Sequence, residues 1–393
     1  MTTDRPTGEL GNLTVEEERK LQQAWAHILR LCDTSHASNE VGAWGETPHR
    51  SDEFQQYLVS VPSELFRNSL WRIILLDHPD SILLRFLRAR KWDVEKAIEM
   101  MVSDMNWREE VKIDEHIIAG GESVALNQSL SEDDKGFLHQ YRSGKSYVRG
   151  VDKQQRPVYV VKARLHDPNM QTSKALQNYI LHNIESIRIL VKHPKDKACL
   201  FFDMTGFGLK NMDFEISKFL THVFEARYPE TLGAIIIHNS PFVFWGVWRI
   251  VKGWLDPVVA AKVTFTRNES ELHEHIDKDN LQTEYGGNDE WEYNYIEPSH
   301  GDDHLLGKEE EKAPIQEDRN DLANQFETHT AEWLALHPNT PEAKSLSAKR
   351  DELAEKLRLN YWRLDPYIRA TTYYHRAGVV GRTGEVDFMG AKQ

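Results

Sequence analysis

The sequence predicts an α/β protein: a mainly parallel sheet with covering helices, an N-terminal helical lobe and a C-terminal helical extension. Four short runs are nearly all apolar and rich in β-branched or aromatic residues: RPVYVVKAR (156–164), ACLFFDMTG (198–206), GAIIIHNS (233–240) and KVTFT (262–266). Such runs are typical of strands covered on both faces. Helical patterns at 174–191 and 212–227 lie between them. This alternation predicts parallel strands joined by right-handed crossovers.

The first hundred residues have the pattern of a small helical lobe. Thr14 and Glu17 have the spacing of a capping box, and apolar residues follow at helical spacing: Leu21, Trp25, Ile28, Leu29 and Cys32. Residues 77–110 predict two helices, the second beginning after a cap at Asp93. Residues 1–13 are expected to be disordered, and residues 33–60 to be irregular.

Changes in composition predict the boundaries of the parts. We expect an N-terminal lobe (14–125), a sheet domain (135–290), an acidic linker (291–320), a C-terminal helical extension (321–378) and a tail (379–393). The linker carries acidic runs and few core residues, which is typical of loosely attached segments. The Tyr- and Arg-rich run at 358–376 is expected to pack on its own domain with its charged ends exposed. Binding of a partner there remains open.

Composition limits the function classes. The net charge of −14 opposes general nucleic-acid binding and strong electrostatic adhesion to anionic membranes. No run approaches the ~20 apolar residues that cross a bilayer, and the N-terminus resembles neither a secretory signal nor a transit peptide. The chain's cysteines, Cys32 and Cys199, are too few for a disulfide framework. We therefore expect a cytoplasmic protein whose membrane contacts are transient, local and largely apolar.

An unusually apolar stretch, SPFVFWGVWRIVKGWLDPVVAAK, occupies residues 240–262 between the last two predicted strands. A helix that is apolar on nearly every side is normally buried or in contact with a membrane. One interpretation is a buried covering helix whose exposed strip carries Arg249 and Lys252. The other is a mobile lid that closes an apolar cavity on one face and meets a bilayer with Trp and Phe on the other. Composition alone does not choose between them.

The sequence contains no pattern that indicates an enzyme. Neither G-x-S-x-G nor G-x-x-x-x-G-K-[ST] occurs, and the histidines of LHEHIDKD (272–279) lack the H-E-x-x-H spacing. Asp203 follows a predicted strand, where a turn or cap role is commoner than catalysis. We expect no catalysis, no metal site and no cofactor.

Several motifs in order resemble the CRAL-TRIO lipid-binding family. They are LLRFLRARKWDVEKAIEMM (83–101), RPVYVV (156–161), FFDMTG (201–206), YPETLG (228–233), NSPFVFWGVWRIVKGWLDPVVAAKV (239–263) and EYGG (284–287). Within that family the chain is most similar to the non-classical fungal phosphatidylinositol transfer proteins, over residues 14–290. The resemblance implies the CRAL-TRIO fold, one buried lipid and a gating helix at 242–254. It therefore favours the lid interpretation, with Phe242, Phe244, Trp245, Trp248 and Trp254 as gate and pocket residues.

The resemblance also implies the residues that hold an inositol phosphate headgroup. They are Arg90 in the helical lobe, and Glu230 and Lys262 in the sheet domain. Basic side chains balance a phosphodiester, and a carboxylate accepts hydrogen bonds from ring hydroxyls. Without the family pattern, each would pass as an ordinary surface residue. The family's threonine three residues before the lysine is replaced here by Val259, so one phosphate contact is missing.

A second departure from the family pattern concerns phosphatidylcholine. The hydroxyl side chains that bind this lipid in classical members align with Val148, Ile184, Ala198 and Leu200. An apolar wall leaves a buried phosphate without hydrogen bonds, which costs several kcal/mol. We expect little phosphatidylcholine transfer, and a sterol or an isoprenoid hydrocarbon as a better second ligand.

Three functions remain open from sequence. The first is transfer of phosphatidylinositol between membranes. The second is carriage or sensing of a sterol or isoprenoid hydrocarbon. The third is presentation of phosphatidylinositol to a lipid kinase without net transport. One pocket serves all three, so the sequence does not separate them.

Overall fold

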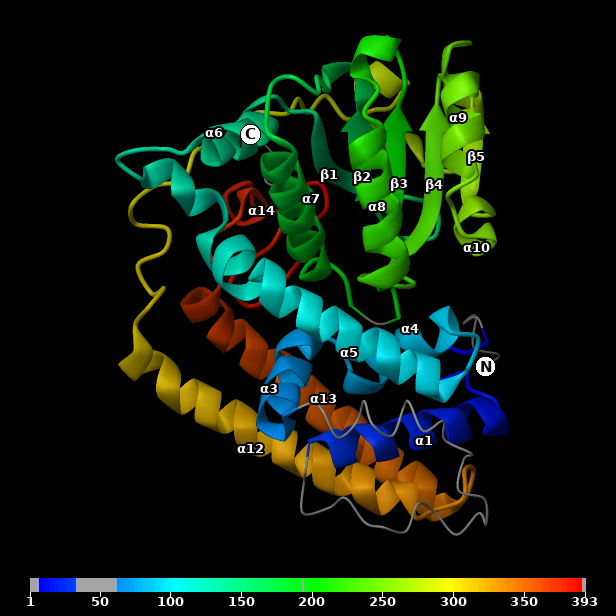
Figure 1. Ribbon diagram of the computed structural model, residues 1–393, viewed down its shortest axis with the longest axis vertical. Coiled ribbons are helices and arrows are strands. Elements are labelled where there is room, and N and C mark those ends of the chain that lie inside the picture. Colours follow the sequence, from blue (N-terminus) through cyan, green and yellow to red (C-terminus); the bar gives the residue numbers. More distant parts are fainter. Residues whose placement is uncertain (1–6, 33–61, 193, 391–393) are drawn as a thin grey trace. The chain divides into compact units, whose positions relative to one another are not determined.

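The structure is a computed structural model that describes residues 7–32, 62–192 and 194–390 (Figure 1). The irregular segment expected at 33–60 and the first six residues of the expected disordered end lie outside the described residues. The chain forms two compact units, one from the residues up to Val111 with Gly307–Tyr367 and one from Lys112–Leu306 with the residues from Ile368 onward. The chain therefore passes between the units three times.

The first unit is helical. Its helices are α1 (Val15–Leu31), α3 (Ser63–Ile74), α4 (Pro79–Ala89), α5 (Val94–Val111), α12 (Glu309–Leu334) and α13 (Pro341–Ile368). The capping box before α1 is confirmed, because the Thr14 side chain accepts from the Glu17 amide at 3.2 Å and Glu17 Oε2 accepts from the Thr14 amide at 2.8 Å. The Asp93 cap of α5 is also confirmed, with Oδ1 3.2 Å from the Lys96 amide. Disorder at 7–13 is wrong, since Arg88 Nη1 donates to the Gly8 carbonyl at 2.7 Å and fixes a turn there.

A buried arginine links the first and last helices of this unit. Arg350 of α13 is 1% exposed, and its Nη2 donates to Asp80 Oδ1 of α4 at 2.5 Å. The same Asp80 oxygen accepts from Trp25 Nε1 of α1 at 2.7 Å. The guanidinium also lies 4.4 Å from the centre of the Trp333 ring of α12. Removing one partner of such a buried set is strongly destabilising. The predicted C-terminal helices, α12 and α13, therefore pack within the same compact unit as the N-terminal helices.

The second unit contains a five-stranded sheet in the order β1-β2-β3-β4-β5. The strands are β1 (Ser146–Val151), β2 (Pro157–Lys162), β3 (Ala198–Asp203), β4 (Leu232–His238) and β5 (Val263–Thr266). Strands β2 to β5 are parallel, which confirms the mainly parallel sheet, and β1 pairs with β2 in the antiparallel sense. Strand β1 was not predicted, because Arg149 and Gly150 interrupt its apolar run. Gly150 has a φ of +69° where the register shifts.

The two faces of the sheet have different covers. One face packs on the short helix α11 (Glu269–Leu272) and on the chain around Leu281 and Tyr285. Helices α7 (Ser173–Arg188), α8 (Phe214–Ala226) and α9 (Phe244–Lys252) lie over the other face (Figure 1). Helices α6 (Glu132–Arg142), α10 (Pro257–Ala260) and α14 (Tyr373–Arg376) complete this unit together with short helical turns. The predicted crossover helices thus flank the predicted strands.

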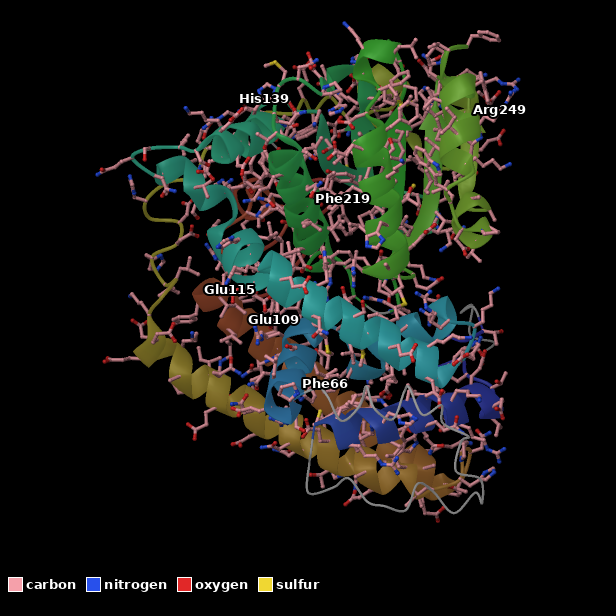
Figure 2. All side chains as sticks on the ribbon, in the orientation of Figure 1. Phe66, Glu109, Glu115, His139, Phe219 and Arg249 are labelled. Carbon is pink, nitrogen blue, oxygen red and sulfur yellow. The ribbon has the colours of Figure 1, made fainter. Side chains whose placement is uncertain are left out.

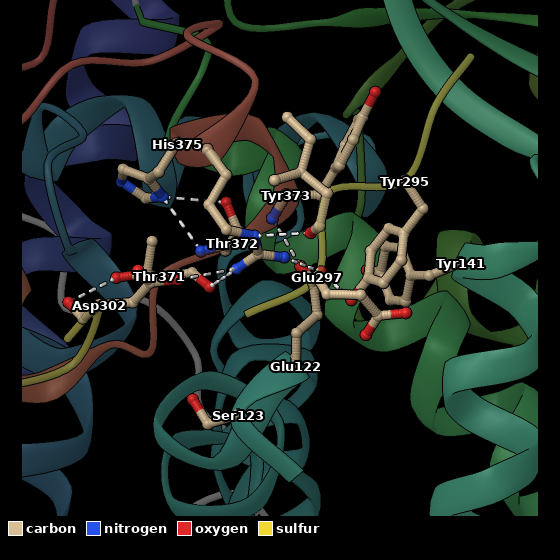
Figure 3. Close-up of polar contacts among 12 residues, drawn as sticks. Glu122, Ser123, Tyr141, Tyr295, Glu297, Asp302, Thr371, Thr372, Tyr373 and His375 are labelled. Atoms are coloured by element: carbon tan, nitrogen blue, oxygen red, sulfur yellow. Dashed lines mark hydrogen bonds and ion pairs between the residues drawn. The ribbon is translucent and has the colours of Figure 1, made fainter. Parts of the chain in front are cut away.

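The region expected to be an acidic linker is ordered along its length. Tyr295 Oη donates to Glu122 Oε2 at 2.7 Å (Figure 3). Tyr293 Oη donates to the Tyr141 carbonyl at 2.8 Å. Residues 309–320 form the first turns of α12. The aromatic rings between the acidic residues make apolar contacts, which the charge pattern alone does not predict.

The last described residues pack on the sheet unit. The amide of Gly150 in β1 donates to the Phe388 carbonyl at 3.0 Å, and Val379 and Val380 are buried, so a loose tail is wrong for these positions. Packing of the Tyr- and Arg-rich run is confirmed. Exposure of its charged ends is wrong for Arg369, which is buried, and for Arg376, whose side chain is only 7% exposed.

We predict that Arg376→Ala lowers the free energy of unfolding by about 3–5 kcal/mol, because it leaves the buried Glu122 carboxylate without its ion pair. Arg376 also donates to the Ile296 carbonyl at 2.9 Å. Urea unfolding followed by tryptophan fluorescence measures the effect. The matched control is Arg142→Ala, which breaks an exposed pair with Glu297 in the same unit and should cost less than about 1 kcal/mol. Equal losses in the two variants would contradict the prediction.

Candidate functional site

Two of the three predicted headgroup residues lie side by side at the amino edge of the sheet. Glu230 precedes β4 and Lys262 precedes β5, and the Ile235 amide donates to the Lys262 carbonyl at 2.9 Å. Lys262 Nζ is 3.9 Å from Glu230 Oε2, and the two side chains are 20% and 19% exposed. An ion pair of this length and exposure contributes little to stability. Both groups can therefore turn to a ligand at low cost.

The backbone at Glu230 is in an unusual conformation. Its φ of +60° lies in the left-handed region, where a residue with a Cβ is strained. The turn is fixed by a hydrogen bond from Thr231 Oγ1 to the Tyr228 carbonyl at 2.7 Å. Strain at a residue with reactive or binding chemistry is common at functional sites, and it supports a role for this carboxylate beyond folding.

The remaining headgroup positions lie on short helical ends. Arg90 is the C-terminal cap of α4 in the first unit, is partly buried, and donates from its amide to the Phe86 carbonyl at 3.0 Å. Its contact with a headgroup remains a prediction. Val259 lies on α10, partly buried against the apolar cluster under α9.

The positions predicted to form an apolar wall gather on the sheet face under α7, α8 and α9. Val148, Tyr159, Leu200, Ile235 and Val263 are cross-strand neighbours that form one row over all five strands. Side chains alternate along a strand, so Ala198 shares the face of Leu200. Val148 and Leu200 are buried, whereas Ala198 and Ile184 of α7 are partly buried. Three of the four positions thus share one face.

This face also carries hydroxyl groups that the sequence analysis missed. Tyr159 Oη lies 2.5 Å from Ser146 Oγ, and Ser146 Oγ lies 2.6 Å from Tyr179 Oη of α7. Tyr159 stands between two valines in an almost apolar run, so only the period of the strand signals that it faces α7. These hydroxyls satisfy one another.

Helix α9 has one buried side and one exposed side. Phe244 and Val247 are buried, and the Phe244 ring meets that of Phe207 at 5.8 Å between centres. Phe242, just before the helix, is 94% exposed, and Trp245 and Ile250 are also exposed. Arg249 lies on the outer side of the helix (Figure 2). Full burial with only the two basic residues outside is therefore wrong.

A few contacts connect the end of α9 to α8. The Trp254 and Phe214 rings lie 5.9 Å apart, and Lys218 Nζ lies 5.2 Å from the Trp254 ring. The Asp256 amide donates to Glu225 Oε1 at 2.6 Å. On its inner side Trp248 meets the Phe265 ring of β5 at 5.3 Å. Beyond its chain neighbours and the backbone of its own helix, Gly246 has no described atom within 4 Å of the place that a Cβ would take.

Comparison with known proteins identifies the family. The CRAL/TRIO domain model matches residues 141–287, and the CRAL/TRIO N-terminal domain model matches residues 51–103. A CRAL-TRIO domain-containing protein of Schizosaccharomyces pombe is 38% identical over 354 residues, covering 90% of this chain and 77% of that protein. The chain belongs to the CRAL-TRIO family.

Other CRAL-TRIO relatives carry more specific names. The phosphatidylinositol transfer protein CSR1 of Eremothecium gossypii is 38% identical over 330 residues, covering 84% of this chain and 74% of that protein. The phosphatidylinositol/phosphatidylcholine transfer protein SFH12 of Arabidopsis thaliana is 32% identical over 244 residues, covering 57% and 43%. Among the described residues of this CRAL-TRIO chain, no helix has the length and apolarity needed to cross a membrane.

We predict that Glu230→Gly and Glu230→Val have different effects on stability. Glycine adopts the left-handed conformation freely, so its variant should unfold within about 1 kcal/mol of the wild type. A β-branched residue at the same φ should cost about 1–2 kcal/mol. Urea unfolding of the two variants gives the comparison. Equal stabilities would show that this backbone conformation is not maintained in solution.

Proposed function

We propose that this protein transfers phosphatidylinositol between membranes and carries one molecule at a time against the sheet face under α7, α8 and α9. The observation that supports this most is the weak, partly exposed Lys262–Glu230 pair at the amino edge of the sheet. It stands beside an apolar face that begins with Val263 and Ile235 in the same two strands. An amphiphile with a charged, hydroxylated headgroup matches both features.

The headgroup chemistry follows from the two side chains. When a lipid phosphate approaches, the Lys262 ammonium leaves Glu230, which is 3.9 Å away, and forms a charge-assisted hydrogen bond with the phosphate. The freed Glu230 carboxylate then accepts hydrogen bonds from inositol hydroxyls. Val259 offers no hydrogen bond where a threonine hydroxyl is expected, so phosphate affinity is reduced by about one hydrogen bond.

The acyl chains need an apolar environment comparable to the bilayer. Each methylene contributes ~0.8 kcal/mol to membrane retention, so two acyl chains hold a lipid by tens of kcal/mol. Large apolar side chains of the helix-covered face are only partly buried, among them Phe202, Phe224, Trp248 and Phe265. They supply surface on which the chains find the same apolar contact.

Helix α9 is the proposed gate. Its exposed aromatic side chains suit the interface of a bilayer, where Trp combines an apolar ring with a polar N–H group. Arg249 and Lys252 follow on the exposed side and match lipid phosphates. The contacts that connect Trp254 and Asp256 to α8 are few, so opening the end of α9 breaks little packing. A chain of net charge −14 has to rely on such a local apolar contact.

A second candidate is a carrier of a sterol or an isoprenoid hydrocarbon. It is favoured by the apolar side chains at Val148, Ala198 and Leu200, where phosphatidylcholine binding would require hydroxyls. The nearby hydroxyls of Tyr159 and Ser146 are already bonded to each other. Mass spectrometry of lipids that copurify with the protein from its host separates this candidate from phosphatidylinositol transfer.

We predict that Lys262→Ala and Glu230→Gly each reduce phosphatidylinositol transfer between vesicles by tenfold or more, since each removes a charge-assisted contact of about 1.5–3 kcal/mol. Labelled lipid in donor vesicles and unlabelled acceptors measure the rate. Lys153→Ala is the control, because it removes an exposed lysine whose carboxylate partner Asp277 lies 3.8 Å away.

In the same assay, phosphatidylcholine should transfer at a small fraction of the phosphatidylinositol rate. Stoichiometric phosphatidylcholine in the purified protein, or unchanged transfer by Lys262→Ala, would overturn the assignment. If even the wild-type protein moves no labelled phosphatidylinositol between vesicles, the result would favour a lipid presenter instead.

We predict that Phe242→Ser weakens binding to phosphatidylinositol-containing vesicles by about tenfold or more, because inserting one phenylalanine contributes about 1.5–3 kcal/mol. Phe242 is almost fully exposed, so the free energy of unfolding should change by less than about 0.5 kcal/mol. Vesicle flotation measures the binding. Leu359→Ser, at an exposed apolar position of α13, should leave binding unchanged. Equal losses of vesicle binding in the two variants would exclude a specific role for Phe242, which precedes α9.

A further inference from the structure

A buried lysine stands at the opposite edge of the sheet from Glu230 and Lys262. Lys145 immediately precedes β1 and is 7% exposed. Its carbonyl accepts from the Lys162 amide at the end of β2 at 2.8 Å, which places it at the carboxyl edge of the parallel strands. Lys145 Nζ lies 3.3 Å from His166 Nδ1, and His166 Nε2 lies 3.4 Å from Asp213 Oδ2. We call Lys145, His166 and Asp213 the Lys145 cluster.

The amine of Lys145 forms no direct ion pair with a described carboxylate, and the nearby Asp213 lies on the other side of the His166 ring. In the described part of the chain, no carboxylate lies within 4.0 Å of Lys145 Nζ. Its near partners are the His166 ring and the face of the Tyr179 ring, whose centre is 5.6 Å away. A buried ammonium without a carboxylate is costly, whereas a neutral amine is tolerated.

Burial lowers the pKa of Lys145 to about 7, and the Asp213 carboxylate opposes this shift. Groups from four elements interact with the amine: His139, which lies on α6 (Figure 2), Tyr179 of α7, Asp213 at the start of α8, and His166 after β2. Asp167, next to His166, acts on the two histidines. The pKa values of both histidines are lowered, first by burial and then by Lys145. A neutral His166 that accepts at Nδ1 donates from Nε2 to Asp213, so the hydrogen bonds fix its tautomer.

The cluster borders the apolar face of the sheet. Ala163 and Met212 belong to the apolar cluster under α8 and α9, and they stand three residues before His166 and one before Asp213. Leu165 and Leu209 nearby are exposed. An amine that is buried, lacks a carboxylate and adjoins apolar surface is suited to an amphiphile with an acidic end.

We propose that Lys145 binds the carboxylate of a long-chain fatty acid whose hydrocarbon chain lies on the apolar face under α7, α8 and α9. The ligand places a negative charge in direct contact with the amine, and the pair forms in a medium where charge-assisted hydrogen bonds are strong. An ester or alcohol of the same chain length offers no such charge. The site is separate from the proposed headgroup pair and adds a ligand class to phosphatidylinositol transfer.

Proton linkage follows from this pairing. At pH 8 the amine of the free protein is mostly neutral, while the fatty acid is a carboxylate in water. Formation of the ammonium–carboxylate pair therefore takes up close to one proton for each ligand bound. At pH 6 the free amine is already protonated, so the uptake falls toward zero. A contact with an exposed, permanently charged lysine would show no such change with pH.

Calorimetric titration of the full chain with palmitate, in two buffers of different ionisation enthalpy at pH 6 and pH 8, tests the proposal. We expect one palmitate per chain, with proton uptake at pH 8 only. Lys145→Met keeps an unbranched side chain one atom shorter than lysine, removes the amine and should weaken palmitate binding about 10- to 100-fold. Lys153→Met is the matched control and should bind as the wild type does. Binding of methyl palmitate should not depend on Lys145.

Palmitate binding of equal strength to the wild type and Lys145→Met would overturn the proposal, as would binding without proton uptake at pH 8 or no binding at all. The proton measurement on the wild-type chain holds even if Lys145→Met fails to fold. Lys262→Ala separates the two proposals, because it should lose phosphatidylinositol transfer and keep palmitate affinity. Lys145→Met should show the reverse.

Discussion

The two faces of the five-stranded sheet are buried to different degrees, and the ligand chemistry depends on this difference. The face toward α11 is closed, with Cys199, Phe201 and Ile236 almost completely buried. On the other face Tyr159, Phe202 and Phe265 remain partly exposed beneath the helices. A close-packed face gives the sheet its rigidity. A partly exposed apolar face is stable only when other apolar groups cover it. Helices with few contacts to one another can move apart, so a lipid can take their place on that face.

Charged groups stand at both ends of this apolar face and differ in how they are neutralised. At the amino edge Lys262 has a carboxylate partner in Glu230, which is 3.9 Å away and which a ligand can replace. At the carboxyl edge Lys145 has a histidine in place of a carboxylate and is far more buried. Lys262 can exchange the Glu230 carboxylate for the anion of a ligand. Lys145, which has no carboxylate in contact, takes up a proton when an anionic ligand binds. We therefore propose different amphiphiles for the two edges, one with a hydroxylated phosphate and one with a simple acid.

The sequence predicted the features that depend on local pattern, and the structure added those that depend on distant partners. The capping box at Thr14 and the four parallel strands follow from residues within one element. Strand β1 was missed because Arg149 meets its partner Asp289 from 140 residues away. The packing of the C-terminal run depends on Arg376 and Glu122, which are 254 residues apart. Periodicity carries no information about such pairs.

The candidate site divides in the same way. Glu230 and Lys262 were named only through the family resemblance, since a turn glutamate and a lysine before a strand are ordinary in isolation. The Lys145 cluster has no local motif at all, because 21 and 47 residues separate its successive members. The positive φ of Glu230 is likewise a property of the folded turn.

The path of the chain explains why the sheet unit does not correspond to one continuous segment. Glu122 precedes β1 in the sequence, and its counter-charge Arg376 follows both C-terminal helices, α12 and α13. Until those helices have been added, a buried carboxylate lacks its ion pair and β1 lacks the Phe388 carbonyl as an acceptor. Contacts of such long sequence separation form late, because loop closure has to precede them. The family-matched segment 141–287 taken alone would therefore expose Tyr141, Tyr147 and Arg149, whose partners lie outside it. The proposed lipid-binding face therefore depends on residues that lie far apart in the sequence.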